Sequence, residues 1–457
     1  MKLYNTLTSK AEEFIPANGM DVNMYVCGVT PYSSTHVGHA LSYIVFDVLR
    51  RYLEYQGYLV RHVQNFTDVD DKIIQRSIEE GISGDDLAQR YMNDFFTTMD
   101  ALNVQRASVY PRATQEIPRI VETIEKLIEK GFAYPAVGDV YFRVTKSEDY
   151  GKLSSRTLDG MIAGARIQIE ENKEHPMDFA LWKGAKDGEP SWDSPWGPGR
   201  PGWHIECTTM SLDNLGDSID IHGGGQDLIF PHHENEIAQS EAYTGIKPFS
   251  RYWVHNGLLQ FDHDKMSKST GNMVSAEEAL ANYSADALRV YFLSSHYRSP
   301  LNYSHEGALA TERSVDRFRY ALGLTKNSGS VLDMTPYESR FVEAMEDDLN
   351  TPQAIAALFD LAREINRCHA NGFNVEDAQS SLRKLGGILG ITFNPKQSKK
   401  SSDLVAEPFI QMLLDIRTEL RDTKQYDLSD KIRNMLTEQG VTIEDTADGA
   451  QWSYDPE

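Results

Sequence analysis

The strongest constraint on the fold comes from a strand–helix–strand pattern near the start of the chain. Residues 24–28 and 58–66 are short apolar runs of the kind that predict buried strands. The segment between them has apolar residues at three- and four-residue steps, which predicts an amphipathic helix: Leu41, Ile44, Val45, Val48, Leu49, Tyr52 and Leu53. A strand, a helix and a strand over about 40 residues form a βαβ unit, so we expect a parallel sheet and an α/β fold class.

Changes in residue composition and apolar periodicity divide the rest of the chain into segments. We expect a Rossmann-like domain in two halves, residues 1–120 and 201–250, interrupted by an insertion at 121–200. In the second half, Asp220 to His222 is predicted to end a strand, and the glycines at 223–225 to form the turn after it. The remaining segments are a loop-bearing region at 251–305, a helix bundle at 306–393, a Lys/Ser linker at 394–402 and a small α+β module at 403–457.

Composition limits the cellular compartments and the kinds of binding partner that suit this chain. The 457 residues have a formal net charge of −23, which repels nucleic acid in general and leaves only local basic patches for contact with an RNA. The three cysteines do not make a disulfide framework, and this usage suits a reducing compartment. The first residues lack a signal-peptide pattern and no run of about 18 apolar residues occurs, so we expect a cytoplasmic protein with no membrane span.

His36, Gly38 and His39 follow the first predicted strand, at the start of the predicted helix. A helix N-terminus favours phosphate through its free N–H groups, and two imidazoles three residues apart share one face of the first turn. They could stabilise charge that develops on a phosphate, while Gly38 would let a nucleotide approach the backbone. The alternative is a pair of surface or capping histidines.

A second motif, Lys265-Met266-Ser267-Lys268-Ser269, lies in a loop flanked by Ser and Gly. Two lysines in a flexible loop suit the binding of a polyphosphate leaving group, because they can move in as charge develops. The alternative is an ordinary exposed basic loop. Together, the H-x-G-H and K-M-S-K-S motifs are far more specific than either alone, and the chain resembles the class I aminoacyl-tRNA synthetases.

Four further residues are candidate metal ligands. Cys27 ends the first predicted strand, Cys207 precedes a later strand, and His232 and Glu236 lie four residues apart at the start of a helix. In a parallel sheet these positions gather at one crevice, and two thiolates, an imidazole and a carboxylate suit a tetrahedral zinc ion. The spacing is too long-range to be diagnostic, and buried packing cysteines are the alternative.

Longer motifs are similar to those of the cysteinyl-tRNA synthetase family, from about Leu3 to Trp452. Besides the two motifs above, the resemblance is carried by Cys27-Gly28-Val29-Thr30, Asn65-Phe66-Thr67-Asp68-Val69-Asp70-Asp71-Lys72, Pro201-Gly202-Trp203-His204-Ile205-Glu206-Cys207, Asp220-Ile221-His222-Gly223-Gly224-Gly225 and Phe230-Pro231-His232-His233-Glu234-Asn235-Glu236.

The resemblance implies an enzyme that joins L-cysteine to its tRNA through a cysteinyl-adenylate, using ATP with Mg²⁺. It also implies one zinc ion on the four candidate ligands, whose bond to a substrate thiolate would distinguish cysteine from serine better than pocket shape. The implied roles are catalysis by His36, His39, Lys265 and Lys268, ATP binding by these residues with Gly38 and Asp227, and cysteine binding by Gly28, Thr30, Thr67, Trp203 and His222. Asp227 could instead be a turn residue, and Thr67 a strand-end cap.

By the same resemblance we expect a monomer whose 251–305 region contacts the tRNA stem and whose helix bundle and final module bind the anticodon. The basic residues of the final module are the candidates for that contact, or else a solvated helix face: Arg417, Arg421, Lys424, Lys431 and Arg433. Three positions depart from the family pattern, namely Ser33, Val37 and Leu41. Ser33 and Leu41 put some contacts near the adenylate in doubt.

Two other functions remain open from the sequence. A relative with the same catalytic core joins activated cysteine to an amino-sugar inositol in the mycothiol pathway, but it resembles a truncated synthetase without a module like 403–457. A non-catalytic tRNA-binding relative would be expected to have lost catalytic motif residues, whereas His36, His39, Lys265 and Lys268 are all present.

Overall fold

A computed structural model describes residues 1–164, 172–261, 264–265, 274–394, 407–437, 441–446 and 449–454. The chain forms two compact units, Met1–Pro395 and Lys396–Glu457, each of which is described by itself. Of the linker expected at 394–402, all but the first residue lies outside the described part.

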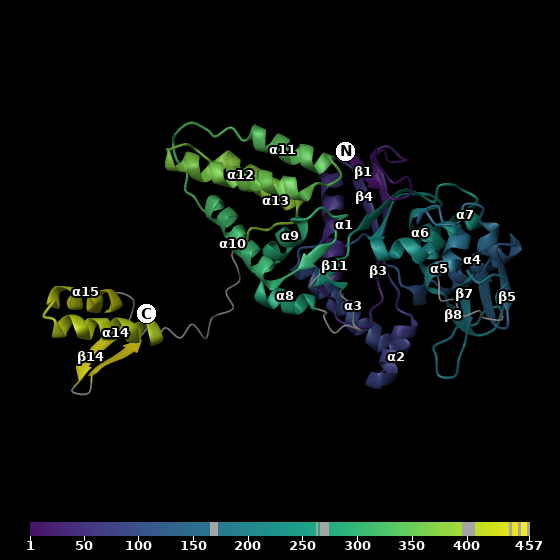
Figure 1. The fold of residues 1–457 in the computed structure, drawn as a ribbon, viewed down its shortest axis with the longest axis horizontal. Coiled ribbons are helices and arrows are strands. Elements are labelled where there is room, and N and C mark those ends of the chain that lie inside the picture. Colours follow the sequence, from purple (N-terminus) through teal and green to yellow (C-terminus); the bar gives the residue numbers. More distant parts are fainter. Residues whose placement is uncertain are drawn as a thin grey trace. The chain divides into compact units, whose positions relative to one another are not determined.

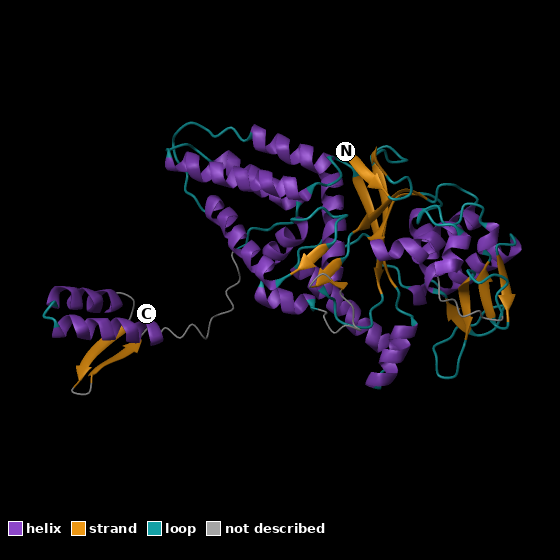
Figure 2. Cartoon of the chain, in the orientation of Figure 1, coloured by secondary structure: helices purple, strands orange, loops and turns teal. Residues whose placement is uncertain are grey.

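A parallel four-stranded sheet is the centre of the first unit, and it confirms the predicted α/β fold (Figures 1 and 2). Its strands lie in the order β10 (Ser250–Asn256), β9 (Ile219–Gly225), β3 (Asp21–Val29) and β4 (Leu59–Phe66). Helix α1 (Val37–Tyr55) connects β3 to β4 and buries the apolar face that its periodicity predicted. The carboxyl ends of β3 and β9 therefore lie side by side, where ligands bind in folds of this kind.

One local prediction was wrong. The glycines at 223–225 do not form a turn, because β9 continues through Gly225 and pairs in register with β10. A Cβ atom on Gly223 would lie 2.3 Å from Cε1 of Phe46 in α1. Glycine is therefore needed inside this strand because a helix side chain packs against its backbone.

The first unit contains several smaller layers around the sheet (Figure 1). An antiparallel sheet follows β4 along the chain and consists of β5 (Ala133–Ala136), β6 (Asp139–Phe142), β7 (Phe179–Gly184) and β8 (Gly199–Pro201). The hairpin of β1 (Lys2–Asn5) and β2 (Lys10–Glu13) contacts β10, and a small sheet contains β11 (Leu259–Phe261), β12 (Asp264–Lys265) and β13 (Leu301–Tyr303). The other α-helices described before the bundle are α2 (Asp71–Glu80), α3 (Gly84–Ala101), α4 (Ile117–Glu129), α5 (Leu158–Gly164), α6 (Trp203–Leu215), α7 (Glu234–Thr244), α8 (Ala276–Asn282) and α9 (Ala285–Leu293).

A helix bundle completes the first unit, with α10 (His305–Leu322), α11 (Thr335–Glu346), α12 (Thr351–Ala370) and α13 (Glu376–Ile388). The second unit has α14 (Glu407–Asp422) and α15 (Tyr426–Thr437) packed on the hairpin of β14 (Val441–Thr446) and β15 (Gly449–Tyr454). None of the helices in the described residues is long and apolar enough to cross a membrane.

Candidate active site and metal centre

A cleft of about 430 Å³ opens where β3 and β9 end and α1 begins. Its lining includes these residues to which the sequence assigned a role: Cys27, Gly28, Thr30, His36, Gly38, His39, Trp203 and Asp227. Thr67 and His222 are buried and are not among the lining residues. The Thr67 hydroxyl accepts a hydrogen bond from Nδ2 of Asn65 at 3.4 Å. The motifs, far apart in the sequence, thus meet at one end of the sheet.

His36 caps helix α1 and also lines the cleft. Its Nδ1 accepts a hydrogen bond from the backbone N–H of His39 at 3.2 Å, which is the geometry of an N-cap residue. The two imidazoles stack with their centroids 3.6 Å apart. The capping interpretation therefore holds for His36 without excluding a functional one, because both rings remain at the mouth of a helix N-terminus.

The lysine-rich motif lies mostly outside the described residues. Lys265 belongs to β12, which pairs with β11 beside Leu259 of the cleft, while its side chain and all of Lys268 are not described. After the gap, the carbonyl oxygen of Val274 accepts a hydrogen bond from the N–H of Val37 in α1. Both described ends of the segment are therefore attached to elements that form the cleft.

The four candidate metal ligands converge beneath the cleft. Their donor atoms all lie within 4.8 Å of one another. The Sγ atoms of Cys27 and Cys207 are 3.9 Å apart, and Oε1 of Glu236 lies 3.5 Å from Sγ of Cys27 and 3.1 Å from Nε2 of His232. Strand β3, helix α6, the turn before α7 and the first turn of α7 supply one ligand each.

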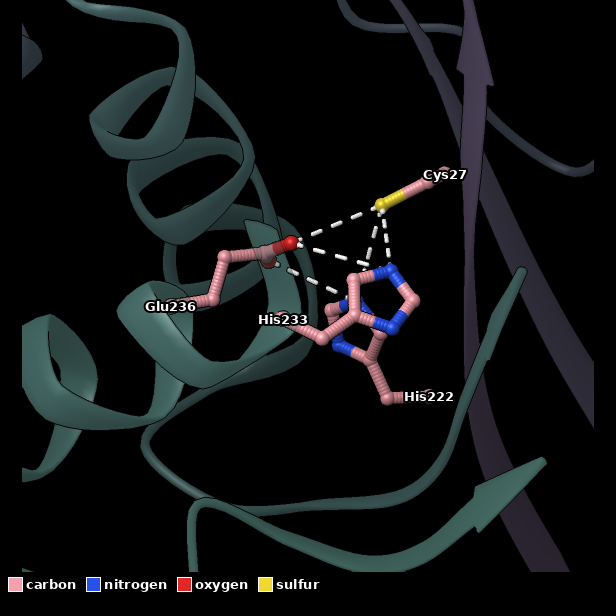
Figure 3. A group of neighbouring side chains, drawn as sticks. All are labelled: Cys27, His222, His233 and Glu236. Atoms are coloured by element: carbon pink, nitrogen blue, oxygen red, sulfur yellow. Dashed lines mark hydrogen bonds and ion pairs between the residues drawn. The ribbon is translucent and has the colours of Figure 1, made fainter. Parts of the chain in front are cut away.

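A second group of four side chains shares two of these ligands (Figure 3). His222 and His233 approach Sγ of Cys27 with their Nε2 atoms, at 3.6 Å and 3.3 Å, and Glu236 lies beside both rings. Because Cys27 and Glu236 are common to both groups, a single cation can use only one of them. The group with Cys207 and His232 is the one that the family resemblance implies, and it leaves Nε2 of His233 free to hydrogen-bond with Cys27.

Burial makes a cation the group that fits this cluster. Glu236 is fully buried, and its Oε2 has no hydrogen-bond partner in the described structure, with Nε2 of His222 at 3.4 Å. Burial and the hydrogen bond that the Cys27 thiol donates to Sγ of Cys207 raise the pKa of Cys27 well above its usual value, and burial holds the pKa of His232 well below its own. A buried carboxylate beside two sulfurs and neutral imidazoles is costly without positive charge, and this donor set is the one that zinc prefers.

His232 is held by two neighbours, His204, to which the sequence analysis assigned no role, and Trp203, which it assigned to cysteine binding. Nδ1 of His204 lies 2.8 Å from Nδ1 of His232, and the indole of Trp203 stacks on the His232 ring at 4.1 Å. A partner on the second ring nitrogen fixes the tautomer and leaves Nε2 facing the cluster. His204 is part of a motif quoted above, but only the fold brings it to His232.

Lys72 is a further cleft residue without a role in the sequence predictions. Its Nζ lies 5.3 Å from the centre of the Tyr32 ring, and it is the one Lys or Arg among the described residues of the lining. The preceding residue, Asp71, forms ion pairs with Lys183 at 3.0 Å and with Arg200. These pairs hold the start of α2 against the antiparallel sheet, so the ammonium group of Lys72 stays at the cleft.

The departures from the family pattern separate by position. Ser33 lines the cleft, whereas Leu41 and Val37 are buried in the core around α1.

In the second unit, Arg417 is almost fully buried, so the expectation that it offers charge on the surface was wrong. The other four basic residues of that set are exposed.

Comparisons with known proteins agree with this geometry. The family model described as "tRNA synthetases class I (C) catalytic domain" matches residues 13–313, and the DALR domain model matches residues 340–394. Among solved structures, methionyl-tRNA synthetase of Mycobacterium tuberculosis in complex with methionyl-adenylate superposes with a TM-score of 0.60 at 18% identity, over 82% of this chain and 88% of that one. The fold and the site define a class I aminoacyl-tRNA synthetase.

Full-length relatives identify the member of that class. "Cysteine--tRNA ligase" of Dehalococcoides mccartyi (strain BAV1) is 54% identical over 99% of both chains. The proteins of the same name from Carboxydothermus hydrogenoformans and Thermotoga maritima are 48% and 47% identical, over 99% and 100% of both chains respectively. The chain belongs to the cysteine–tRNA ligase family, and the amino-sugar ligase alternative is not favoured.

Proposed function

We propose that this protein activates L-cysteine with ATP and transfers it to cysteine tRNA. The observation that supports this best is the convergence of Cys27, Cys207, His232 and Glu236 directly beneath the cleft that His36 and His39 line. A thiol-binding centre next to a phosphate-binding helix N-terminus is what the joining of cysteine to a nucleotide requires.

In the first step the cysteine carboxylate attacks the α-phosphate of ATP and pyrophosphate leaves. His36 and His39 stabilise the negative charge at the N-terminus of α1, where Gly38 lets the triphosphate approach the backbone. Lys265 and Lys268 bind the departing pyrophosphate, with Mg²⁺ on the phosphates. Asp227, which also lines the cleft, holds the ribose or the substrate amino group.

The substrate side chain points to the metal cluster. Gly28, Thr30 and Trp203 form the pocket wall, with His222 and Thr67 buried behind it. A bound zinc ion supplies a direct bond to the substrate thiolate, and a serine hydroxyl is a poor replacement for that ligand. The four protein ligands hold this position while Trp203 keeps His232 oriented.

In the second step a ribose hydroxyl at the tRNA 3′ end attacks the adenylate. The region 251–305 contacts the acceptor stem, and the helix bundle with the second unit binds the anticodon end, where Arg421, Lys424, Lys431 and Arg433 offer exposed positive charge. The protein works in the cytoplasm as a monomer. The support for these roles is the membership of the chain in the cysteine–tRNA ligase family.

The decisive experiment is cysteine-dependent ATP–pyrophosphate exchange, run beside the charging of total tRNA, with serine as the competing amino acid. Exchange with cysteine, cysteinyl-tRNA formation and rejection of serine would support the proposal. Exchange without charging would transfer the chain to the small-molecule ligases. A folded, zinc-loaded protein that shows no exchange would refute the proposed activity.

A further inference from the structure

We infer that Thr6 and His255 are positioning residues of the metal centre, acting through His233 on the ligand Cys27. A line of hydrogen bonds joins them. Oγ1 of Thr6 lies 2.8 Å from Nδ1 of His255, Nε2 of His255 lies 2.8 Å from Nδ1 of His233, and Nε2 of His233 lies 3.3 Å from Sγ of Cys27. The inference rests on the metal site proposed above.

Each link in this line is held in place by the surrounding fold. Thr6 follows β1, and its backbone N–H donates to the carbonyl oxygen of Trp253 in β10 at 2.9 Å. His255 lies two residues further along β10, and both His255 and His233 are buried. The Trp253 side chain lies against the rings of His222, at 4.4 Å, and His233, at 5.3 Å. The hairpin at the N-terminus is thereby connected to the cluster of Figure 3.

If Cys27 binds a metal, the donor and the acceptor of every hydrogen bond in this line are determined. A cysteine that coordinates zinc is a thiolate and accepts hydrogen bonds only, so Nε2–H of His233 must donate to it. A neutral His233 then accepts at Nδ1, so Nε2–H of His255 must donate, and Nδ1 of His255 must accept from the Thr6 hydroxyl. Burial lowers the pKa of His255 to about 3, which agrees with a neutral ring.

The Thr6 hydroxyl therefore sets the tautomer of two histidines in sequence. Without it, Nδ1 of His255 has no donor, and the tautomer that directs a hydrogen bond to Cys27 loses its support. Removing an outer partner of a metal ligand typically costs about 10–100-fold in metal affinity. Since Thr6 acts through two rings, we expect Thr6→Val to lie near the lower end, about a tenfold increase in the zinc dissociation constant.

The test measures zinc affinity in the full-length protein by competition with a chromogenic chelator. Thr6→Val is compared with Thr6→Ser, which restores the hydroxyl, and with Thr8→Val, a matched change in the same hairpin. Among the described residues, the Thr8 hydroxyl donates only to the carbonyl oxygen of Asn5, at 3.4 Å. Cobalt-substituted protein supplies a second readout, because the thiolate-to-metal absorption band responds to the hydrogen bond on Cys27.

The expected result is weaker zinc binding and a shifted cobalt band in Thr6→Val, with Thr6→Ser and Thr8→Val close to the unaltered protein. Equal affinities in all four proteins would overturn the inference, and so would an equal loss in Thr8→Val, which would indicate general loosening of the hairpin. Failure of the unaltered protein to take up zinc would also overturn it. If the zinc pattern holds but cysteine-dependent exchange is absent, the proposed activity fails and the positioning role stands.

Discussion

Replacing Arg289 by methionine should cost the first unit about 3–5 kcal/mol of its free energy of unfolding. Arg289 is fully buried in α9, and its guanidinium donates to Oδ2 of Asp47 in α1 at 2.5 Å. It also donates to the carbonyl oxygens of Leu389, Leu102 and Asn103, at 2.8, 2.9 and 3.2 Å. One side chain thus joins the helix that begins at the cleft to the end of the helix bundle.

The magnitude follows from what the substitution leaves behind. Asp47 keeps a hydrogen bond from Nε of Arg51 and one from the N–H of Gln105, both at 2.9 Å, so its charge is not left wholly without partners. The carbonyl oxygens of Leu389 and Leu102 lose a buried donor, whereas that of Asn103 keeps the hydrogen bond from Nη2 of Arg51 at 2.8 Å. Each unsatisfied group costs about 1–3 kcal/mol. These losses place the total within the range for breaking a buried ion pair.

Urea denaturation followed by tryptophan fluorescence measures the change, with Arg340→Met as the control. Arg340 pairs with Asp360 at 3.0 Å, but the two side chains are 49% and 32% exposed, so this substitution should cost only about 0–1 kcal/mol. Asp47 lies about 16 Å along α1 from His36, and pyrophosphate exchange by the folded Arg289→Met protein should therefore change little. A stability loss within about 1 kcal/mol of the control would refute the assignment of a buried, coupled pair.

Three further changes test the cleft. Lys72→Met should lower kcat/KM for ATP about tenfold or more, because it removes a positive charge from the cleft in which we propose that the phosphates bind, whereas Arg76→Met, one turn later on α2 and paired with Glu80, should not. Equal effects of the two substitutions in exchange assays would contradict this. Cys207→Ser should lose zinc by metal analysis and lose discrimination against serine, as chelation of the unaltered protein should, while Cys368→Ser keeps both. Gly28→Ala would place a Cβ atom 1.5 Å from a backbone oxygen of β4, so it should reduce the yield of folded protein, and a normal yield and melting temperature would count against the β3–β4 geometry.

The sequence was sufficient where structure is determined locally. The apolar period of residues 41–53 and the runs on either side of it predicted α1 and the strands next to it, because burial of one helix face and of a central strand leaves a direct pattern. The same reasoning misplaced the glycines at 223–225. In the sequence, a glycine that ends a strand looks the same as a glycine that makes room for a neighbouring aromatic ring. Only the position of Phe46 in the fold distinguishes the two cases.

The side chains around the metal cluster were harder to predict, because they come from six separate elements. The spacing of the candidate residues did not decide which of them bind the metal. The resemblance to a family implied four ligands, Cys27, Cys207, His232 and Glu236. Nothing in the local pattern indicates that His204 turns toward His232 or that His255 reaches His233, since both lie on buried elements where a satisfied core histidine is expected. Arg417 shows the converse error, because a basic residue on an amphipathic helix was expected in solvent and is buried.

This distribution has a physical reason that extends to the function. A parallel sheet gathers strand ends that are far apart in the chain, so a centre built at that edge receives one residue from each element and its second layer from still others. In this chain the second layer includes the N-terminal hairpin, through Thr6, and the strand β10, through His255. The proposed selection of a thiol by a metal requires ligands fixed to a fraction of an ångström, and such accuracy depends on the buried hydrogen bonds behind the ligands as much as on the ligands themselves.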